Sequence, residues 1–247
     1  MFLNVTITGA DDDVDPNQLA HLSRFYPFVE WGILFSEKRR ALPRYPSLRW
    51  IRSLEDVAAR RGQMKLAMHL CGSEARIATL GAKEFSPGAM WRRVQVNGYE
   101  TGTATREWIQ NGFTWILQAR TRETLRAAID DACVSSADVL YDPSGGEGSV
   151  QQEWPTMPTA SVSEERSIGY GYAGGINPIN VAAVIGQVRG KSLALDRIWI
   201  DMESGVRTED RFDIEKVKAV LAAVADARRE VWIHRSVVVG AERKENR

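Results

Sequence analysis

Eight short runs rich in β-branched and aromatic residues recur along this chain of 247 residues, and most are followed by a segment with helical periodicity. Parallel strands need crossover connections, so this alternation predicts a mostly parallel sheet. Eight strands in a chain of this length favour a single α/β domain, a closed (β/α)8 TIM barrel of eight parallel strands, over an open sheet. No glycine-rich GxGxxG follows the first run, which counts against a dinucleotide-binding sheet. The predicted strands lie at 2–8, 28–35, 64–70, 93–97, 113–118, 138–142, 168–173 and 197–202, and the predicted helices at 16–25, 48–61, 73–82, 103–111, 121–132, 178–188 and 212–228.

Two segments depart from this alternation. Residues 143–167 contain glycine, proline and serine without a helical stripe, so we expect a loop in place of the sixth helix. The chain after about residue 230 ends in AERKENR, and we expect a frayed tail there. The predicted organisation is therefore one barrel domain over 1–230 and a C-terminal tail over 231–247.

Charge and cysteine content restrict the class of protein. The chain has 32 Lys and Arg residues and 32 Asp and Glu residues, so its formal net charge is zero. Such a charge gives no general electrostatic attraction to nucleic acid or to an anionic membrane. No apolar run approaches the roughly 20 residues that span a bilayer, and the N-terminus turns acidic where a signal peptide would be basic and apolar. The two cysteines, Cys71 and Cys133, have no metal-binding or disulfide-framework spacing. We therefore expect a cytoplasmic protein without nucleic-acid or membrane partners, whose oligomeric state the sequence leaves open.

Polar residues alternate with apolar ones near the C-terminal ends of the predicted strands. Alternate residues of a strand point to opposite faces, so the apolar set should pack under the helices and the polar set should line the barrel mouth, where such barrels carry their active sites. Singly, His69 is explained as a core histidine, the cysteines as small buried hydrophobes and the aspartates as loop caps. Together they favour a site, because that much interior polarity needs a ligand or water to satisfy it. The polar set comprises Thr8, His69, Cys71, Gln95, Asn97, Gln118, Asp142, Asp201 and Glu203.

Two kinds of chemistry fit this set poorly. No lysine lies on the inward face of a predicted strand, which disfavours Schiff-base aldolase chemistry. One strand-end histidine with scattered carboxylates is a thin ligand set, so we expect no metal.

Two glycine-rich turns predict a phosphate site. AGGINPIN at 173–180 and DMESGVR at 201–207 follow the seventh and eighth predicted strands, where barrels of this kind commonly hold phosphate. Paired glycines let backbone N–H groups approach a ligand closely, and the helix N-terminus that follows favours an anion. A tight turn without a ligand would explain either stretch alone, but both at the expected loops favour a phosphorylated small-molecule ligand.

These motifs resemble the phosphoribosylanthranilate isomerase family, as a divergent member. The family's seventh strand ends in a glycine pair followed by Asn-Pro-x-Asn-Val, and here GGINPINV occupies 174–181. Its eighth strand carries an Asp shortly before Ser-Ser-Gly-Val, and here Asp201 precedes ESGV at 203–206. VTITG at 5–9 is similar to the family's first strand, and LYDPSGGEGS at 140–149 is similar to its sixth strand and the loop after it.

The resemblance implies roles for several residues. It implies that Asp142 is the general acid that opens the ribose ring and that Asp201 contacts the anthranilate part of the substrate. It implies that Arg39 or Arg40 pairs with the substrate carboxylate. Phosphate would be held by the backbone of Gly174, Gly175, Ser204 and Gly205. Gln95 and Asn97, on the fourth strand, are further candidates for substrate binding.

The general base is where this chain departs from the family. The family's Cys falls at Thr8, whose hydroxyl cannot take a proton at neutral pH without help. His69, Cys71 and Glu203 are candidates to replace it. We therefore expect an Amadori-type aldose–ketose isomerase that needs no cofactor. An isomerase or lyase acting on a different phosphorylated sugar, or a catalytically silent phosphate-ligand binder, are the alternatives.

Overall fold

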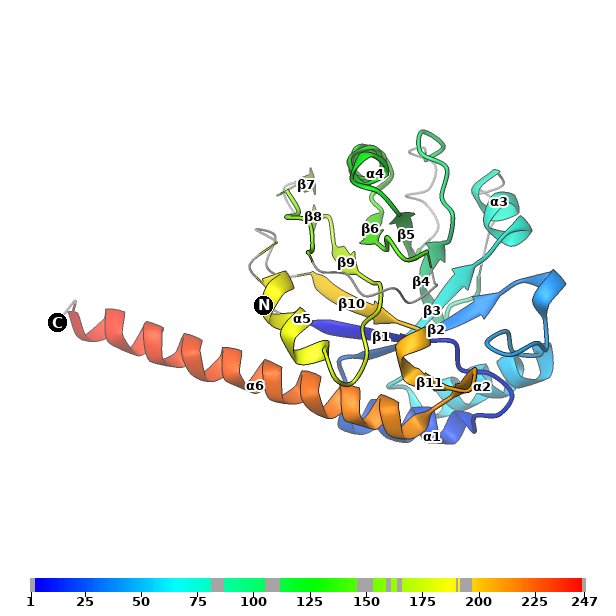
Figure 1. Cartoon of the computed structure of the whole chain (residues 1–247), viewed down its shortest axis with the longest axis horizontal. Coiled ribbons are helices and arrows are strands. Elements are labelled where there is room, and N and C mark those ends of the chain that lie inside the picture. The colour runs from blue at the N-terminus through cyan, green and yellow to red at the C-terminus, as the bar shows by residue number, and fades with distance from the viewer. Residues whose placement is uncertain are drawn as a thin grey trace.

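Eight parallel strands close into a barrel in the computed structural model (Figure 1). The structure describes residues 3–80, 87–104, 112–145, 153–158, 161–163, 166–189, 191 and 197–245. Each of the eight predicted runs overlaps one barrel strand, so the predicted α/β barrel is confirmed. Around the barrel the strands follow the order β1, β10, β9, β6, β5, β4, β3, β2. They are β1 (Asn4–Thr8), β2 (Val29–Phe35), β3 (Leu66–Leu70), β4 (Trp91–Val96), β5 (Thr114–Ala119), β6 (Asp138–Tyr141), β9 (Tyr170–Tyr172) and β10 (Ile198–Met202).

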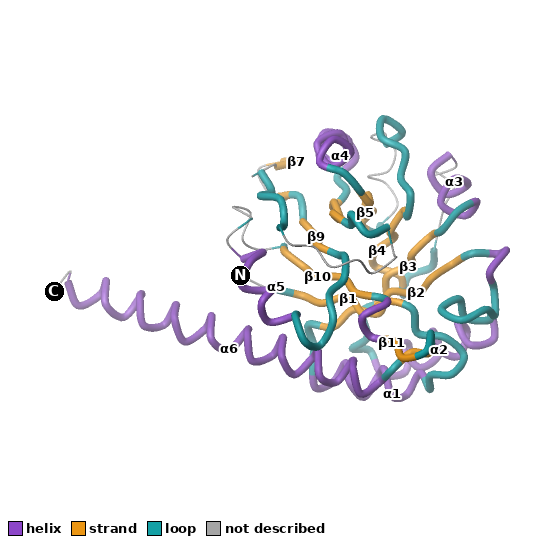
Figure 2. The backbone as a smooth tube through the Cα atoms, viewed as in Figure 1, coloured by secondary structure: helices purple, strands orange, loops and turns teal. Residues whose placement is uncertain are grey.

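Helices surround the barrel (Figure 2). Local signals fix several helix ends. The carboxylate of Asp15 accepts a hydrogen bond from the backbone N–H of Asn17, and Pro16 takes the first helical position. Ser47 caps the next helix, which ends at Gly62 with a φ of 69°. The helices are α1 (Pro16–Phe25), α2 (Leu48–Arg61), α3 (Ser73–Leu80), α4 (Arg122–Ser135), α5 (Val181–Arg189) and α6 (Ile214–Glu245).

The connections differ from the sequence prediction at three places. Most of the helix predicted at 103–111 lies outside the described residues. Between β6 and β9 the described residues contain an antiparallel pair, β7 (Ser161–Ser163) and β8 (Arg166–Ser167), and no helix. Because 146–152, 159–160 and 164–165 are outside the described residues, the loop in place of the sixth helix stays a prediction.

The third difference is α6, which continues as a helix to Glu245 and projects beyond the barrel (Figures 1 and 2). We expected the helix to end near 228 and a frayed tail to follow over 231–247. The segment contains no proline and ends in helix-favouring Ala, Glu, Arg and Lys, which explains why a helix can continue. The barrel boundary at residue 230 stays a prediction.

Strand alternation divides the buried residues as the sequence analysis expected. Val5 and Ile7 of β1, and Leu3 just before it, belong to the large core between strands and helices. A second, smaller apolar cluster combines inward-facing residues of β5, β6 and β10 with one residue after β9: Ile116, Leu140, Trp199 and Ala173.

Beneath this cluster, the N-terminal half of the barrel interior contains a set of charged residues that we call the lower ion network: Glu30, Arg93, Asp138 and Arg197. Arg93 Nη1 lies 3.0 Å from Glu30 Oε1, and Arg93 Nη2 lies 3.6 Å from Asp138 Oδ2. Arg197 Nη2 lies 3.0 Å from the same Asp138 oxygen. The Arg93 guanidinium also stacks 3.9 Å from the Trp199 ring centre. The lower half of the interior is thus polar, and its charges face opposite charges.

Candidate functional site

A cavity of about 1340 Å3 opens at the C-terminal ends of the barrel strands. It is lined by every site residue that we predicted from the sequence except Arg40. Arg40 is exposed, follows a short 3-10 turn at Glu37–Arg39 and does not line the cavity, so its contact with a substrate carboxylate stays a prediction. The predicted residues that line the cavity are Thr8, Arg39, His69, Cys71, Gln95, Asn97, Asp142, Gly174, Gly175, Asp201, Glu203, Ser204 and Gly205.

Thr8 and Asp201 meet on the floor of this cavity. β1 and β10 pair in parallel, and Thr8 Oγ1 donates a hydrogen bond of 2.8 Å to Asp201 Oδ1. Both residues are buried, at 2% and 5% exposure. Burial raises the pKa of Asp201 to about 8, and the carboxylates of Asp142 and Glu203 add to the shift while Thr8 opposes it. Asp201 therefore holds a proton at neutral pH.

Asp142 follows the last residue of β6 and is buried as an acceptor. Gln118 Nε2 donates to its Oδ2 at 2.8 Å, and the Oγ of Ser144 donates to its Oδ1 at 2.7 Å. The backbone N–H of Ser144 also donates to Oδ1, at 3.2 Å. Two carboxyl groups therefore face one cavity, one carrying a proton and the other surrounded by donors. Such a pair can give and accept protons in the same reaction.

β3 and β4 supply a neutral wall to the cavity. Burial, with the nearby charge of Arg93, lowers the pKa of His69 to about 3, so the imidazole is uncharged at neutral pH. Burial also raises the pKa of the Cys71 thiol, which keeps it protonated. Asn97 Nδ2 donates to Cys71 Sγ at 3.2 Å, and Gln95 Nε2 donates to Asn97 Oδ1 at 2.8 Å. This wall offers hydrogen bonds without charge.

The two glycine-rich turns lie against each other at the rim. Gly174 and Gly175 have φ angles of 115° and 64°, which side chains other than glycine adopt rarely. A Cβ on Gly205 would lie 1.9 Å from the carbonyl oxygen of Ile176, so only glycine fits there. The side-chain amides of Asn177 and Asn180 both donate to the carbonyl of Gly175. The turns are thus rigidly braced, directly before the N-terminus of α5.

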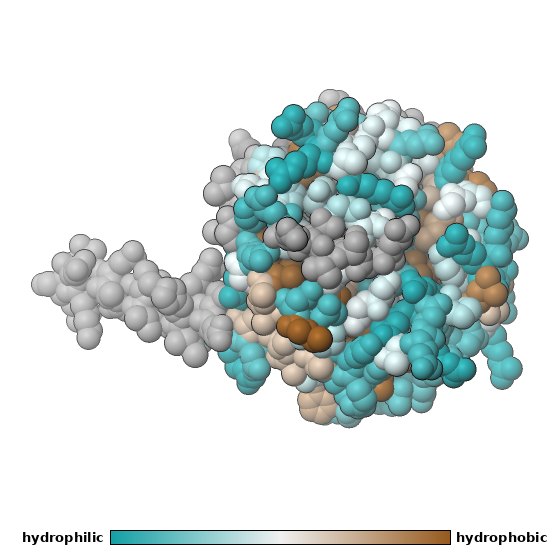
Figure 3. Space-filling view, in the orientation of Figure 1, coloured by the Kyte–Doolittle hydropathy of each residue, from teal (hydrophilic) through white to brown (hydrophobic). Residues whose placement is uncertain are grey.

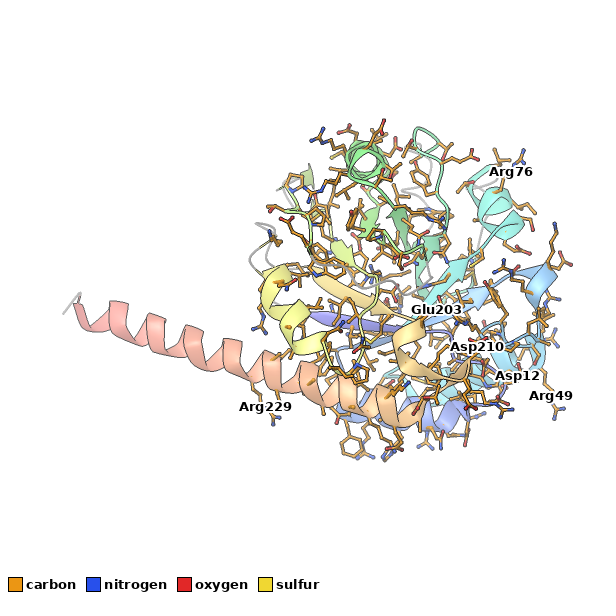
Figure 4. All side chains as sticks on the ribbon, viewed as in Figure 1. Asp12, Arg49, Arg76, Glu203, Asp210 and Arg229 are labelled. Carbon is orange, nitrogen blue, oxygen red and sulfur yellow. The ribbon has the colours of Figure 1, made fainter. Side chains whose placement is uncertain are left out.

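Arg44 is a site residue that the sequence analysis missed. It comes from the connection between β2 and α2, and its Nη1 donates to Glu203 Oε1 at 2.8 Å and to Ser204 Oγ at 3.2 Å. Its Nε donates to Asp210 Oδ1 at 2.6 Å; Glu203 and Asp210 are labelled close together in Figure 4. Arg39 instead donates to the Tyr45 hydroxyl at 3.0 Å. A cation therefore reaches the Ser204 turn across the end of β1.

The described part of the chain contains no helix long and apolar enough to cross a membrane. Within the same residues, no group of three or more His, Cys, Asp and Glu is arranged to hold a metal ion. The face seen in Figure 3 carries mostly hydrophilic residues, with hydrophobic residues scattered among them.

Comparison with solved structures supports the fold. N-(5'-phosphoribosyl)anthranilate isomerase from Pyrococcus furiosus superposes with a TM-score of 0.54 at 14% identity, covering 91% of this chain and 99% of that chain. The phospho-2-dehydro-3-deoxyheptonate aldolase of Thermotoga maritima superposes with a TM-score of 0.52 at 11% identity, covering 93% and 70%. No curated protein sequence matches this chain.

Comparison with family models is more specific. The model described as N-(5'phosphoribosyl)anthranilate (PRA) isomerase matches residues 90–223, which is more than half of the chain. The match includes Asp142 and both glycine-rich turns. The chain therefore belongs to the N-(5'-phosphoribosyl)anthranilate isomerase family.

Proposed function

We propose that this protein isomerises a phosphorylated aminosugar from the aldose to the ketose form without a cofactor. One observation carries the proposal: the buried carboxyls of Asp142 and Asp201 face the same cavity, whose rim carries both glycine-rich turns. Membership of the family supports the reaction class. The cavity is also large enough for a small phosphorylated ligand, since ligand sites in proteins usually span about 300–1,000 Å3.

The phosphate binds at the turns formed by Gly174, Gly175, Ser204 and Gly205. The positive φ angles at the glycine pair leave backbone N–H groups unobstructed by side chains, and the N-terminus of α5 adds its dipole. Arg44 adds a positive charge beside Ser204. A dianion is therefore favoured at this rim over an uncharged group.

Protons move between the sugar and the two carboxyls. Asp201 protonates the ring oxygen as the bond from that oxygen to C1 breaks, which leaves an iminium at C1. Asp142 takes the proton from C2, and the electron pair forms a C1–C2 double bond. Asp142 then returns its proton to C1 while the C2 hydroxyl gives its proton to Asp201, so the ketone forms and both carboxyls are restored. The cycle balances without an oxidant or reductant.

These roles reverse the one that the family resemblance implies for Asp142. The raised pKa of Asp201 makes it the proton donor at neutral pH. The carboxyl oxygens of Asp142 accept hydrogen bonds from Gln118 and Ser144, which suits a proton acceptor. Thr8 then has no proton to take, because its hydroxyl serves to orient Asp201. His69 and Cys71 act as neutral groups, and Glu203 is engaged by Arg44.

The test is a steady-state isomerisation assay of the full chain with an N-substituted 1-aminoribose 5-phosphate. Asp142→Asn and Asp201→Asn should each lower kcat at least about 100-fold, the usual contribution of a positioned acid or base. Exposed Asp56→Asn is the matched control and should retain full activity. With Asp201 as donor, the rate falls as pH rises through about 8.

One observation favours a second candidate, a silent phosphate-ligand binder. Thr8 stands at the position where the family has its general base, and its hydroxyl donates a hydrogen bond to Asp201. Binding of the aminosugar phosphate without turnover by the parent, or by Thr8→Cys, would support this candidate and reject the isomerase. A rate that rises through pH 8 would keep the isomerase but make Asp201 the base.

A further inference from the structure

Two buried polar atoms on the cavity wall lack a hydrogen-bond partner among the described residues: His69 Nε2 and Gln95 Oε1. The two side chains are only 1% and 3% exposed, and both line the cavity. They are neighbours, because His69 on β3 is in register with Gln95 on β4. Leaving such atoms unpaired in a buried position costs stability, so each needs an explanation.

The surrounding contacts fix which atom of Gln95 is left without a hydrogen-bond partner within the described structure. Its Nε2 is used in the hydrogen bond to Asn97 Oδ1, and the Nδ2 of Asn97 is used on Cys71. This chain of donors leaves the Gln95 carbonyl oxygen as an unpaired acceptor beside His69.

Gly32 of β2 explains how His69 can reach the middle of the barrel. A Cβ on Gly32 would lie 2.8 Å from His69 Nε2 and 2.4 Å from Thr8 Oγ1. The imidazole therefore occupies the space that a side chain at position 32 would fill, next to the Thr8–Asp201 hydrogen bond. Its unpaired nitrogen thus lies near Thr8, which donates to the proposed proton donor Asp201.

The charges around this pair select an uncharged partner. Asp142, Asp201 and Glu203 already crowd the cavity with carboxyl groups. Of the cavity arginines near the β2 connection, Arg39 is held by Tyr45 and Arg44 by Glu203. A ligand carboxylate placed between His69 and Gln95 would meet the acceptor oxygen of Gln95, and the nearby cation, Arg93, is already paired with Glu30 and Asp138. A hydroxyl can donate to Gln95 Oε1 and pair with His69 Nε2 at the same time.

We propose that His69 and Gln95 form a hydroxyl subsite, which binds a hydroxyl group of the phosphosugar opposite the phosphate turns. β3 and β4 lie across the barrel from β9 and β10, so a ligand held at both places passes over Asp142 and Asp201. The substrate class is then an aminosugar phosphate that presents a free sugar hydroxyl to β3 and β4, in place of an anionic aryl group. This inference rests on the proposed function.

The experiment measures Kd by titration calorimetry for ribose 5-phosphate, phenyl phosphate and inorganic phosphate, using the full chain. The parent should bind ribose 5-phosphate at least about tenfold more tightly than the other two, which offer no sugar hydroxyl. His69→Leu and Gln95→Met should each remove about that tenfold advantage and leave the Kd of inorganic phosphate within about twofold. Exposed His21→Leu is the control and should change nothing.

A second readout separates a ligand subsite from a structural role. His69→Leu removes an unpaired buried nitrogen, so its Tm without ligand should equal or exceed that of the parent. The inference is overturned if both variants retain the ribose 5-phosphate advantage, if they weaken inorganic phosphate equally, or if phenyl phosphate binds as tightly as the sugar. Absence of binding for all three phosphates would instead reject the proposed function, and this inference with it.

Discussion

The two ends of the barrel interior are both polar, but they satisfy their polar groups differently. In the lower ion network, Glu30 and Asp138 face the guanidinium groups of Arg93 and Arg197. At the mouth, Asp201 keeps a proton because no cation faces it among the described residues, and His69 Nε2 has no partner there. Polarity inside a barrel is therefore not a sign of function by itself. The sign is an unpaired buried polar atom on a residue that lines the cavity, since Arg93 Nε and Nη2 also lack a hydrogen bond in the described part of the chain but belong to ion pairs below the cavity.

The strongest way to test this contrast is to break the lower ion network. Arg93→Met should lower the free energy of unfolding by about 3 kcal/mol, because Glu30 loses its cation and Asp138 loses one of two. Denaturant unfolding measures the change, and exposed Arg92→Met is the matched control. If the Arg93 variant were as stable as the Arg92 variant, the ion pairs of the lower ion network would not stabilise the fold.

Removing the titratable carboxyl at the mouth should have the opposite effect on stability. With its pKa raised to about 8 from an ordinary value of 3.8, Asp201 retains a proton in the folded state that the unfolded chain releases. Its contribution to stability is therefore complete below about pH 4 and is lost as pH rises to 8. Asp201→Asn removes this loss, so the variant should exceed the parent by at least about 1.4 kcal/mol at pH 8. Equal pH profiles of unfolding for parent and variant would contradict the buried, protonated Asp201.

Arg44 offers a smaller test, at the rim. Arg44→Met removes the cation beside Ser204, so the Kd for inorganic phosphate should rise about tenfold. Raising the salt concentration should weaken phosphate binding less in the variant than in the parent. Exposed Arg49→Met, on α2, is the control. An unchanged Kd would mean that Arg44 only holds Glu203 and Asp210 together.

Thr8→Val should have the smallest effect. The substitution removes the donor to Asp201 but no group that transfers a proton, so kcat should fall less than about tenfold. Loss of the donor also raises the pKa of Asp201 further, because Thr8 opposes the upward shift. The fall in rate at high pH should therefore move to higher pH. A hundredfold loss of kcat in Thr8→Val would instead indicate that the Thr8 hydroxyl takes part in proton transfer.

The sequence predicted the eight strands and most of the mouth because strand alternation and turn chemistry are local. Asp142 and Asp201 were identified from their own neighbours in the chain, and the structure brings them to one cavity. Glu30 was missed because it is a single polar residue within FVEWGILF, and its partner Arg93 is 63 residues away. Glu30 and Arg93 come into contact only when the strands fold into the barrel.

Arg44 could not have been separated from Arg39 and Arg40 by sequence reasoning. All three lie in one irregular connection, where no periodicity fixes the direction of a side chain. The direction of Arg44 is decided by Glu203, which is 159 residues later in the chain. The long α6 was missed for a different reason, since a helix that leaves the barrel needs no amphipathic stripe facing it.

Closure of the barrel by its first and last strands has a consequence for biosynthesis. β1 pairs with β10, the hydrogen bond between Thr8 and Asp201 spans 193 residues, and Arg228 donates to the carbonyl of Leu3. At roughly 5–20 residues per second, the ribosome needs about 10–40 s to deliver β10 after β1. During that time β1 presents an unpaired edge to other nascent chains. Recovery of catalytic turnover during refolding would therefore report the final closure step, because an open barrel does not enclose the cavity that Asp142 and Asp201 line.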